Sequence, residues 1–207
     1  MGSGVIRPEL VPSSPPVPPY PSHSMSDAPS TLCDSVCTAA QSGATGQPDA
    51  TNAAAEALYG QLFGALGGDA DQIEQTGEAC AGLVLANKKG AFSLWHLARG
   101  GAIGVAHAAV GRQLDPAELL GAGVKRMMMD ADGQGADFGA VAQGVLEGAL
   151  VAAGELGLHE ATLGTAVAVA ALETAADIGP AASAKVRRIV NRPIMGRAFD
   201  IPSSLLD

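Results

Sequence analysis

Aromatic residues are scarce in this chain of 207 residues, where Phe, Trp and Tyr together make up 3%. A protein core normally relies on large apolar side chains, each of which stabilises the fold by about 1.5–3 kcal/mol when fully buried. Here much of the apolar content lies on small residues, with abundant Ala and 27 glycines. Small side chains let helices approach closely, so this composition predicts close helix packing, often between subunits of an oligomer.

Basic residues are few and unevenly placed. Only Arg7 precedes Lys88, five of the twelve lie between positions 185 and 197, and the net charge is −9. Nucleic-acid binding relies on Lys and Arg clusters that neutralise phosphates. The sequence therefore argues against general nucleic-acid binding and leaves the C-terminal cluster as the one exception.

Long apolar runs are also missing. The first thirty residues contain no apolar segment of the kind found in signal peptides. The longest charge-free apolar stretch, 161–172, falls short of the roughly 20 residues that span a membrane. Three cysteines, Cys33, Cys37 and Cys80, form an odd set, which is typical of a reducing compartment. We therefore expect a cytoplasmic protein.

Proline is concentrated at the beginning of the chain. The segment PSSPPVPPYPS lies within residues 1–30 and favours an extended polyproline II conformation. Residues 31–50 continue with Gly, Ser, Thr and Asp. We predict a disordered tail and linker over residues 1–50, which acts either as a simple linker or as a PxxP ligand.

Seven helices and no strands are predicted beyond residue 50. Apolar positions recur with helical spacing, and no segment shows sustained period-2 alternation. Helix stops such as Gly179-Pro180 and the helix start Asp115-Pro116 fix several boundaries. We expect an all-α, Gly/Ala-rich bundle or set of hairpins over 51–192, followed by a C-terminal tail, 193–207. The predicted helices are 51–66, 69–87, 91–112, 116–130, 137–156, 159–178 and 181–192.

A duplication is one interpretation of the helical region. Six positions carry identical residues at a separation of 43, among them Gly101 and Gly144. This period would correspond to paired hairpin units, 101–124 and 144–167. Composition alone is the other interpretation, because chance identities are frequent in a chain rich in Gly and Ala.

Small residues recur four apart, which places them on one face of a helix. Gly inside a helix costs about 1 kcal/mol relative to Ala, so several such residues need a structural reason. We predict close helix–helix contact between copies of the chain; a compositional bias toward Ala and Gly is the alternative. The predicted packing residues are Gly100, Gly104, Ala108, Ala136, Ala140, Gly144, Gly148, Ala152, Gly164 and Ala168.

The C-terminal basic cluster is the main candidate for docking. The segment SAKVRRIVNRPIMGRAF combines apolar residues with several cations, which is typical of a helix lying on anionic lipid. It could equally dock on an acidic protein surface, or simply cap the fold with its cations in water. The predicted docking residues are Lys185, Arg187, Arg188, Ile189, Arg192, Ile194 and Arg197.

Motifs for catalysis or metal binding are weak. The chain has no G-x-S-x-G, Walker A or H-E-x-x-H motif. The string DADGQGAD superficially resembles a calcium loop through Asp130, Asp132 and Asp137, but Val141 stands where a bidentate Glu is needed. We predict no catalytic residue and no metal site. The alternative is an enzyme or ligand-binding domain that uses the acidic loop 130–137.

Two segments resemble known proteins. The segments 135–158 (GADFGAVAQGVLEGALVAAGELGL) and 171–190 are similar to bacterial Ala/Gly-rich helical proteins with repeated G-A-D-x-G-A-V-A-x-G units. Size, a flexible N-terminus, the Gly/Ala-rich body and an apolar C-terminal part also resemble the small stalk subunit of the actinobacterial high-affinity NiFe hydrogenase. That resemblance implies a non-catalytic tetramer that tethers larger catalytic subunits to the inner face of the cell membrane. It also implies a hydrophobic chamber that admits menaquinone, with no covalently bound cofactor.

Overall fold

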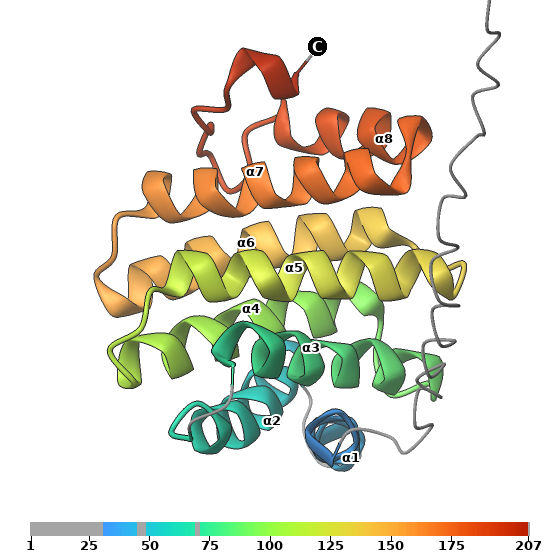
Figure 1. Ribbon diagram of the computed structural model, residues 1–207, viewed down its shortest axis with the longest axis vertical. Helices are drawn as coiled ribbons and strands as arrows, with labels where there is room; N and C mark the ends of the chain where they lie inside the picture. The colour runs from blue at the N-terminus through green and yellow to red at the C-terminus, as the bar shows by residue number, and fades with distance from the viewer. Residues whose placement is uncertain (1–30, 45–48, 69–70, 207) are drawn as a thin grey trace, which may run out of the picture.

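Eight packed helices make up the part of the chain described by the computed structural model (Figure 1), which covers residues 31–44, 49–68 and 71–206. Over these residues it contains no β-strand, and Ile194 and Arg197 form an isolated bridge. The all-α prediction is confirmed, whereas the predicted tail over residues 1–30 lies outside the described residues. The helices are α1 (Thr31–Ala44), α2 (Ala50–Ala65), α3 (Gln72–Lys88), α4 (Leu94–Gly111), α5 (Pro116–Gly133), α6 (Phe138–Leu156), α7 (Glu160–Ile178) and α8 (Pro180–Val190), followed by the short 3-10 helix η1 (Ser203–Leu205).

The helices form two layers that run along the long axis of the molecule. Each helix from α1 to α7 packs most extensively on a helix two places away, so α2, α4 and α6 form one layer and α1, α3, α5 and α7 form the other. Figure 1 shows α1 and α2 at one end of this stack and α8 at the other. The core runs between the layers and is built mainly from Ala, Leu and Val.

Capping residues recur along the chain at a fixed interval. Each helix from α2 to α7 follows a residue whose side chain accepts hydrogen bonds from backbone N–H groups of the first turn, which a helix otherwise leaves unpaired. The fold therefore consists of helical hairpins repeated every 44 residues, one residue more than the period predicted from identities. The caps are Asp49, Ser93 and Asp137 in one layer and Asp71, Asp115 and His159 in the other.

The glycines of one layer make the same contact in successive repeats. A Cβ added to Gly144 would lie 2.6 Å from the carbonyl oxygen of Trp95, closer than real Cβ atoms approach. Gly100, 44 residues earlier, faces the carbonyl of Thr51 in the same way, and Thr51 itself lies 44 residues before Trp95. As a result, α6 packs on α4 as α4 packs on α2. One turn further on, Gly104 meets the carbonyl of Ala55, and Gly148 meets that of Arg99.

These close contacts lie within one chain. We expected them between subunits, so the glycines no longer give an argument for an oligomer. Gly164 is also used internally, because its missing side chain leaves room for the ring of Phe199. Ala108, Ala152 and Ala168 are fully buried, whereas Ala136 and Ala140, near the start of α6, are half-buried.

Helix α1 corrects one prediction. We expected residues 31–50 to form a linker, but Thr31–Ala44 is a helix that packs on α3 and α2, with Val36 and Ala40 buried. The approach is close, since a Cβ on Gly82 of α3 would lie 2.5 Å from the carbonyl oxygen of Cys33. Sequence reasoning missed α1 because the Gly, Ser, Thr and Asp content of residues 31–50 was taken as that of a linker, whereas Cys37, which is buried, behaves as a small apolar residue.

One described helix, α7, is long and apolar enough to cross a membrane by length and composition. This differs from the prediction that no segment reaches that length. In the fold, α7 packs on α5, α6 and α8, and its side chains Leu163, Val167 and Leu172 are buried. Core helices pass the same test, so α7 is weak evidence for a membrane span.

Candidate functional site

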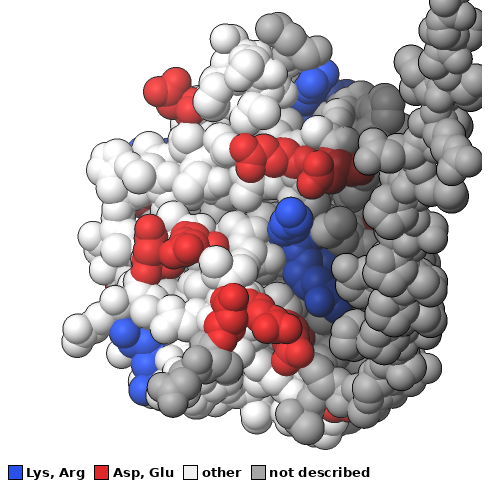
Figure 2. Space-filling model, viewed as in Figure 1, with Lys and Arg blue, Asp and Glu red and all other residues white. Residues whose placement is uncertain are grey.

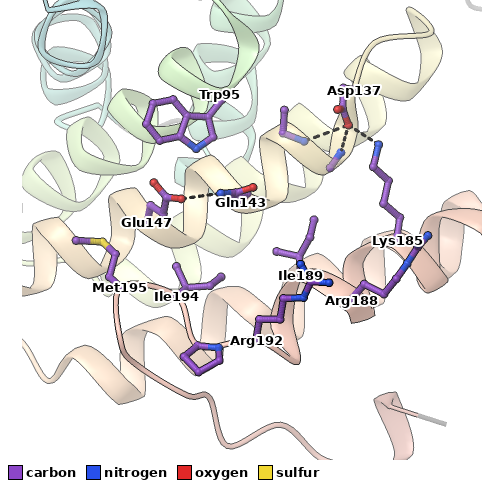
Figure 3. A pocket seen from close by; sticks show the side chains of 13 residues that line it. Trp95, Asp137, Gln143, Glu147, Lys185, Arg188, Ile189, Arg192, Ile194 and Met195 are labelled. Atoms are coloured by element: carbon purple, nitrogen blue, oxygen red, sulfur yellow. Dashed lines mark hydrogen bonds and ion pairs between the residues drawn. The ribbon is translucent and has the colours of Figure 1, made fainter.

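A pocket of about 770 Å³ lies between α6 and α8. Figure 3 shows Trp95 of α4 on one side, the polar side chains of α6 in the middle and the basic side chains of α8 across from them. The lining residues are Trp95, Asp137, Gly139, Ala140, Gln143, Glu147, Lys185, Arg188, Ile189, Arg192, Pro193, Ile194 and Met195.

The pocket exists because the repeat changes at its last helix. Counting on by 44 residues, Arg188 takes the position of Gly100 and Gly144, and Arg192 takes that of Gly104 and Gly148. At the glycine positions even a Cβ would collide with the preceding helix, so an arginine there prevents close packing. Helix α8 accordingly makes far fewer contacts with α6 than α6 makes with α4.

The α6 wall of the pocket is also consistent with a change in the repeat. Gly139 and Gln143 line the pocket, and they lie 44 residues after Trp95 and Arg99, whose carbonyls receive the glycines of α6. The pocket is therefore the place where a further small-residue helix would have packed on α6. Arginine side chains and open space occupy it instead.

An ion pair holds the middle of α8 against the beginning of α6. Lys185 Nζ donates to Asp137 Oδ1 at 2.5 Å, and the same oxygen accepts from the backbone N–H groups of Gly139 and Ala140. The hydrogen bond from Lys185 is the main reason why the pKa of Asp137 lies below its ordinary value, and the backbone donors add to it. Lys185 also lies 5.0 Å from the ring of Phe138.

We expect Asp137→Asn to lower stability at neutral pH by less than about 1 kcal/mol, because both partners are largely exposed and water screens the pair. Asn keeps the capping oxygen, so the change isolates the ionic contribution. The folded pKa of Asp137 lies below 3.8, so the pair contributes above that pH and is lost as the pH falls through the lowered pKa. The free energies of unfolding in urea should differ between the wild type and Asp137→Asn at neutral pH and should be equal in acid. A pH-independent difference would contradict this assignment.

The two arginines have no ionic partner among the described residues. Arg188 Nε donates to the carbonyl of Ala184 in its own helix at 3.1 Å, and Arg192 is exposed two residues beyond the end of α8. Glu147, on the α6 wall, accepts a hydrogen bond from Gln143 at 2.9 Å. The pocket thus offers free guanidinium donors on one wall and an amide and a carboxylate on the other.

The structure brings together five of the seven predicted docking residues. Lys185, Arg188, Ile189, Arg192 and Ile194 line the pocket. The other two hold the C-terminal segment in place: Arg187 donates to the carbonyl of Leu205 at 3.1 Å, and Arg197 pairs with Glu160 at 2.7 Å. Sequence reasoning missed Trp95, Gln143 and Glu147, because no motif or charge pattern in the sequence singles them out.

The alternative site in the acidic loop is not assembled. Helix α5 extends to Gly133, so Asp130 and Asp132 lie on it, and Asp130 pairs with Arg126 at 2.9 Å. Asp137 is the cap of α6. No group of three His, Cys, Asp or Glu side chains in the described part of the chain could hold a metal ion.

The cysteines offer little reactivity. Cys80 is fully buried in α3, and burial raises the pKa of its thiol to about 12. Burial and the neighbouring Asp34 also raise the pKa of Cys33. Because the thiolate is the reactive form, these two residues fit structural roles in the contact between α1 and α3.

No family model, curated protein or solved structure matches this chain. The resemblance to the hydrogenase stalk subunit therefore stays a prediction.

Charge is dispersed on the face of the molecule that Figure 2 shows. Figure 2 shows acidic and basic side chains in separate small groups on a largely uncharged face. The basic residues of α5 have acidic neighbours, with Lys125 at 4.0 Å from Asp177 and Arg126 paired to Asp130. This contrast makes the unpaired arginines of the pocket a local feature rather than part of a general basic surface.

Proposed function

We propose that the protein is a non-catalytic helical-repeat scaffold that binds a partner protein at the pocket between α6 and α8. The observation that carries this proposal is the presence of Arg188 and Arg192 at positions where α4 and α6 have glycine. At these positions α8 does not pack closely on α6. Two charged side chains without ionic partners among the described residues line an open pocket instead. Stacked repeats commonly use an extended surface of this kind to bind other proteins.

The chemistry of the pocket suits recognition. Arg, Trp and Met are enriched where proteins bind one another, and Arg and Trp contribute most to such interfaces. Arg188, Arg192, Trp95 and the 58% exposed Met195 all line this pocket. Its walls provide hydrogen-bond donors and apolar contacts, and no nucleophile paired with a base.

Protein binding fits the packing of α8 better than membrane binding does. A helix on a bilayer must present its apolar face to lipid. Val186 and Val190 of α8 are buried, and α8 packs on α7 and α6. The buried apolar side chains of α8 are thus used inside the fold, while Lys185 and Arg188 line the pocket.

The larger catalytic subunits predicted from the hydrogenase resemblance are one version of this partner. The homotetramer and the menaquinone chamber remain predictions about an assembly. The pocket described above is lined by charged as well as apolar groups, so it does not supply the apolar interior that a quinone chamber needs. Gene neighbours that encode hydrogenase subunits would support that version.

We expect Arg188→Ala/Arg192→Ala to remove the partner from a tagged full-length chain purified from its host after chemical cross-linking. The wild-type chain should give cross-links from Lys185, which lines the pocket, to one recurring protein. Lys88→Ala/Lys89→Ala removes the same charge from the exposed end of α3 and should leave those cross-links intact. Equal retention of the partner by both double variants would refute the proposal.

A further inference from the structure

We infer that the pocket takes an extended acidic segment of the partner, with carboxylate side chains two residues apart. This inference rests on the proposed function and names the chemistry that the site recognises. The spacing of the two arginines matches such a segment. The polarity of the two walls and the size of the pocket favour an acidic peptide over other anions.

The arginines are spaced for alternate side chains of an extended chain. Arg192 lies four residues after Arg188, and its N–H still donates to the carbonyl of Ile189, so the backbone continues the helical turn. Four residues of helix rise by about 6 Å. Alternate residues of an extended chain are about 6.6 Å apart and point to the same side. Two carboxylates on such a chain therefore match two guanidinium groups, each able to bind one in a bidentate way.

The opposite wall gives the ligand a direction. Glu147 and Asp137 lie on the α6 side of the pocket, so a carboxylate would be repelled there and drawn toward α8. Figure 3 shows the indole nitrogen of Trp95 turned toward the α6 side of the pocket, where it can donate to a backbone carbonyl. The α6 wall is thus suited to a peptide backbone, and the α8 wall to its acidic side chains.

Size and charge argue against other anions. A pocket of about 770 Å³ is in the usual range for compact ligands, whereas a helix is about 10–12 Å wide with its side chains. Nucleic acid and anionic bilayers carry dense charge, which the net charge of −9 and the two acids of the α6 wall would repel. A short segment with a few carboxylates on one side carries less charge and can keep those carboxylates on the α8 wall, away from the two acids of the α6 wall.

The single tryptophan of the chain gives a direct test, because Trp95 lines the pocket. The probe is a short capped peptide in which Asp alternates with Gly, titrated into the full-length chain while Trp95 emission is recorded. We expect a saturable change that weakens as salt is added, since salt screens exposed charges. The same peptide with Asn in place of Asp should cause no change.

Two variants assign the change to the arginines. Arg188→Ala and Arg192→Ala should each weaken binding about tenfold or more, as expected for the loss of a charge-assisted hydrogen bond in a pocket. Lys88→Ala/Lys89→Ala should bind the peptide as the wild type does. Equal binding of the Asn peptide, or equal binding by the arginine variants, would overturn the inference.

In a last experiment, vesicles of phosphatidylglycerol replace the peptide and Trp95 emission is recorded again. A Trp95 response to vesicles without a response to the Asp peptide would overturn the acidic-segment inference in favour of lipid. If the arginine variants lose the cross-linked partner while the Asp peptide fails to bind, the inference fails and the proposed function stands. If they keep the partner, the proposed function itself fails.

Discussion

Gly148→Ala should destabilise the fold by a net amount of up to about 2 kcal/mol, although Ala is the better helix former. A Cβ at Gly148 would collide with the carbonyl oxygen of Arg99 and lie 2.9 Å from the Cβ of Ala102. Backbone cannot move aside as a flexible side chain can, so α6 would have to shift away from α4. Overpacking of this kind typically costs about 1–3 kcal/mol, more than the roughly 1 kcal/mol that Ala gains over Gly in a helix.

The repeat supplies a matched control. Gly60 occupies the same repeat position in α2 and is exposed, and no described atom would lie within 4 Å of a Cβ added there. Gly60→Ala should therefore stabilise the chain, by about 0.5–1 kcal/mol, because only the helix propensity changes. Urea unfolding followed by circular dichroism measures both variants. Shifts in the same direction would show that the contact between α4 and α6 is looser than the structure indicates.

Much of the helical layout could be predicted from the sequence, since capping is a local property. Asp115 with Pro116 fixed the start of α5, and Gly179 with Pro180 fixed the boundary between α7 and α8. The repeat was harder to define. Glycine identities suggested 43 residues and paired Gly144 with Gly101, whereas its structural equivalent is Gly100. In a Gly-rich helix several glycines can be aligned with the same glycine of the next repeat, so the period is ambiguous. A cap occurs once per helix and fixes it.

Only the α8 wall of the pocket was predicted from the sequence. The cations of α8 stood out because basic residues are rare in this chain, and most of the predicted docking residues do line the pocket. Trp95 and Gln143 could not be placed beside them, because only the stacking of repeats brings α4 and α6 to the same pocket as α8. Nor could the partner of each glycine be deduced, since small-residue rows are equally suited to contacts within a chain and between chains.

Ending the chain at Gly179, which removes α8 and the C-terminal segment, should cost several kcal/mol of stability, about 5. Val186 and Val190 of α8 are buried, Ile194 is 8% exposed, and the ring of Phe199 covers Gly164. Each fully buried aliphatic side chain is worth about 1.5–3 kcal/mol, and a whole domain is stable by only about 5–15 kcal/mol. The truncated chain should therefore melt far earlier than the full chain.

Where the truncated chain loosens should identify α8 as a cap of the stack. Repeats depend mainly on their neighbours, so hydrogen exchange should accelerate first in α6 and α7, while α1–α3 keep their protection. Charge ends the stack on both sides, because Glu56 in α2 and Arg188 in α8 take the position that is glycine in α4 and α6. Ending the chain after Ile201 instead removes only η1 and its flanking residues, and should change the melting temperature little. Similar melting of the chain that ends at Gly179 and the full chain would make α8 an appendage, and the pocket beside it would lose its structural basis.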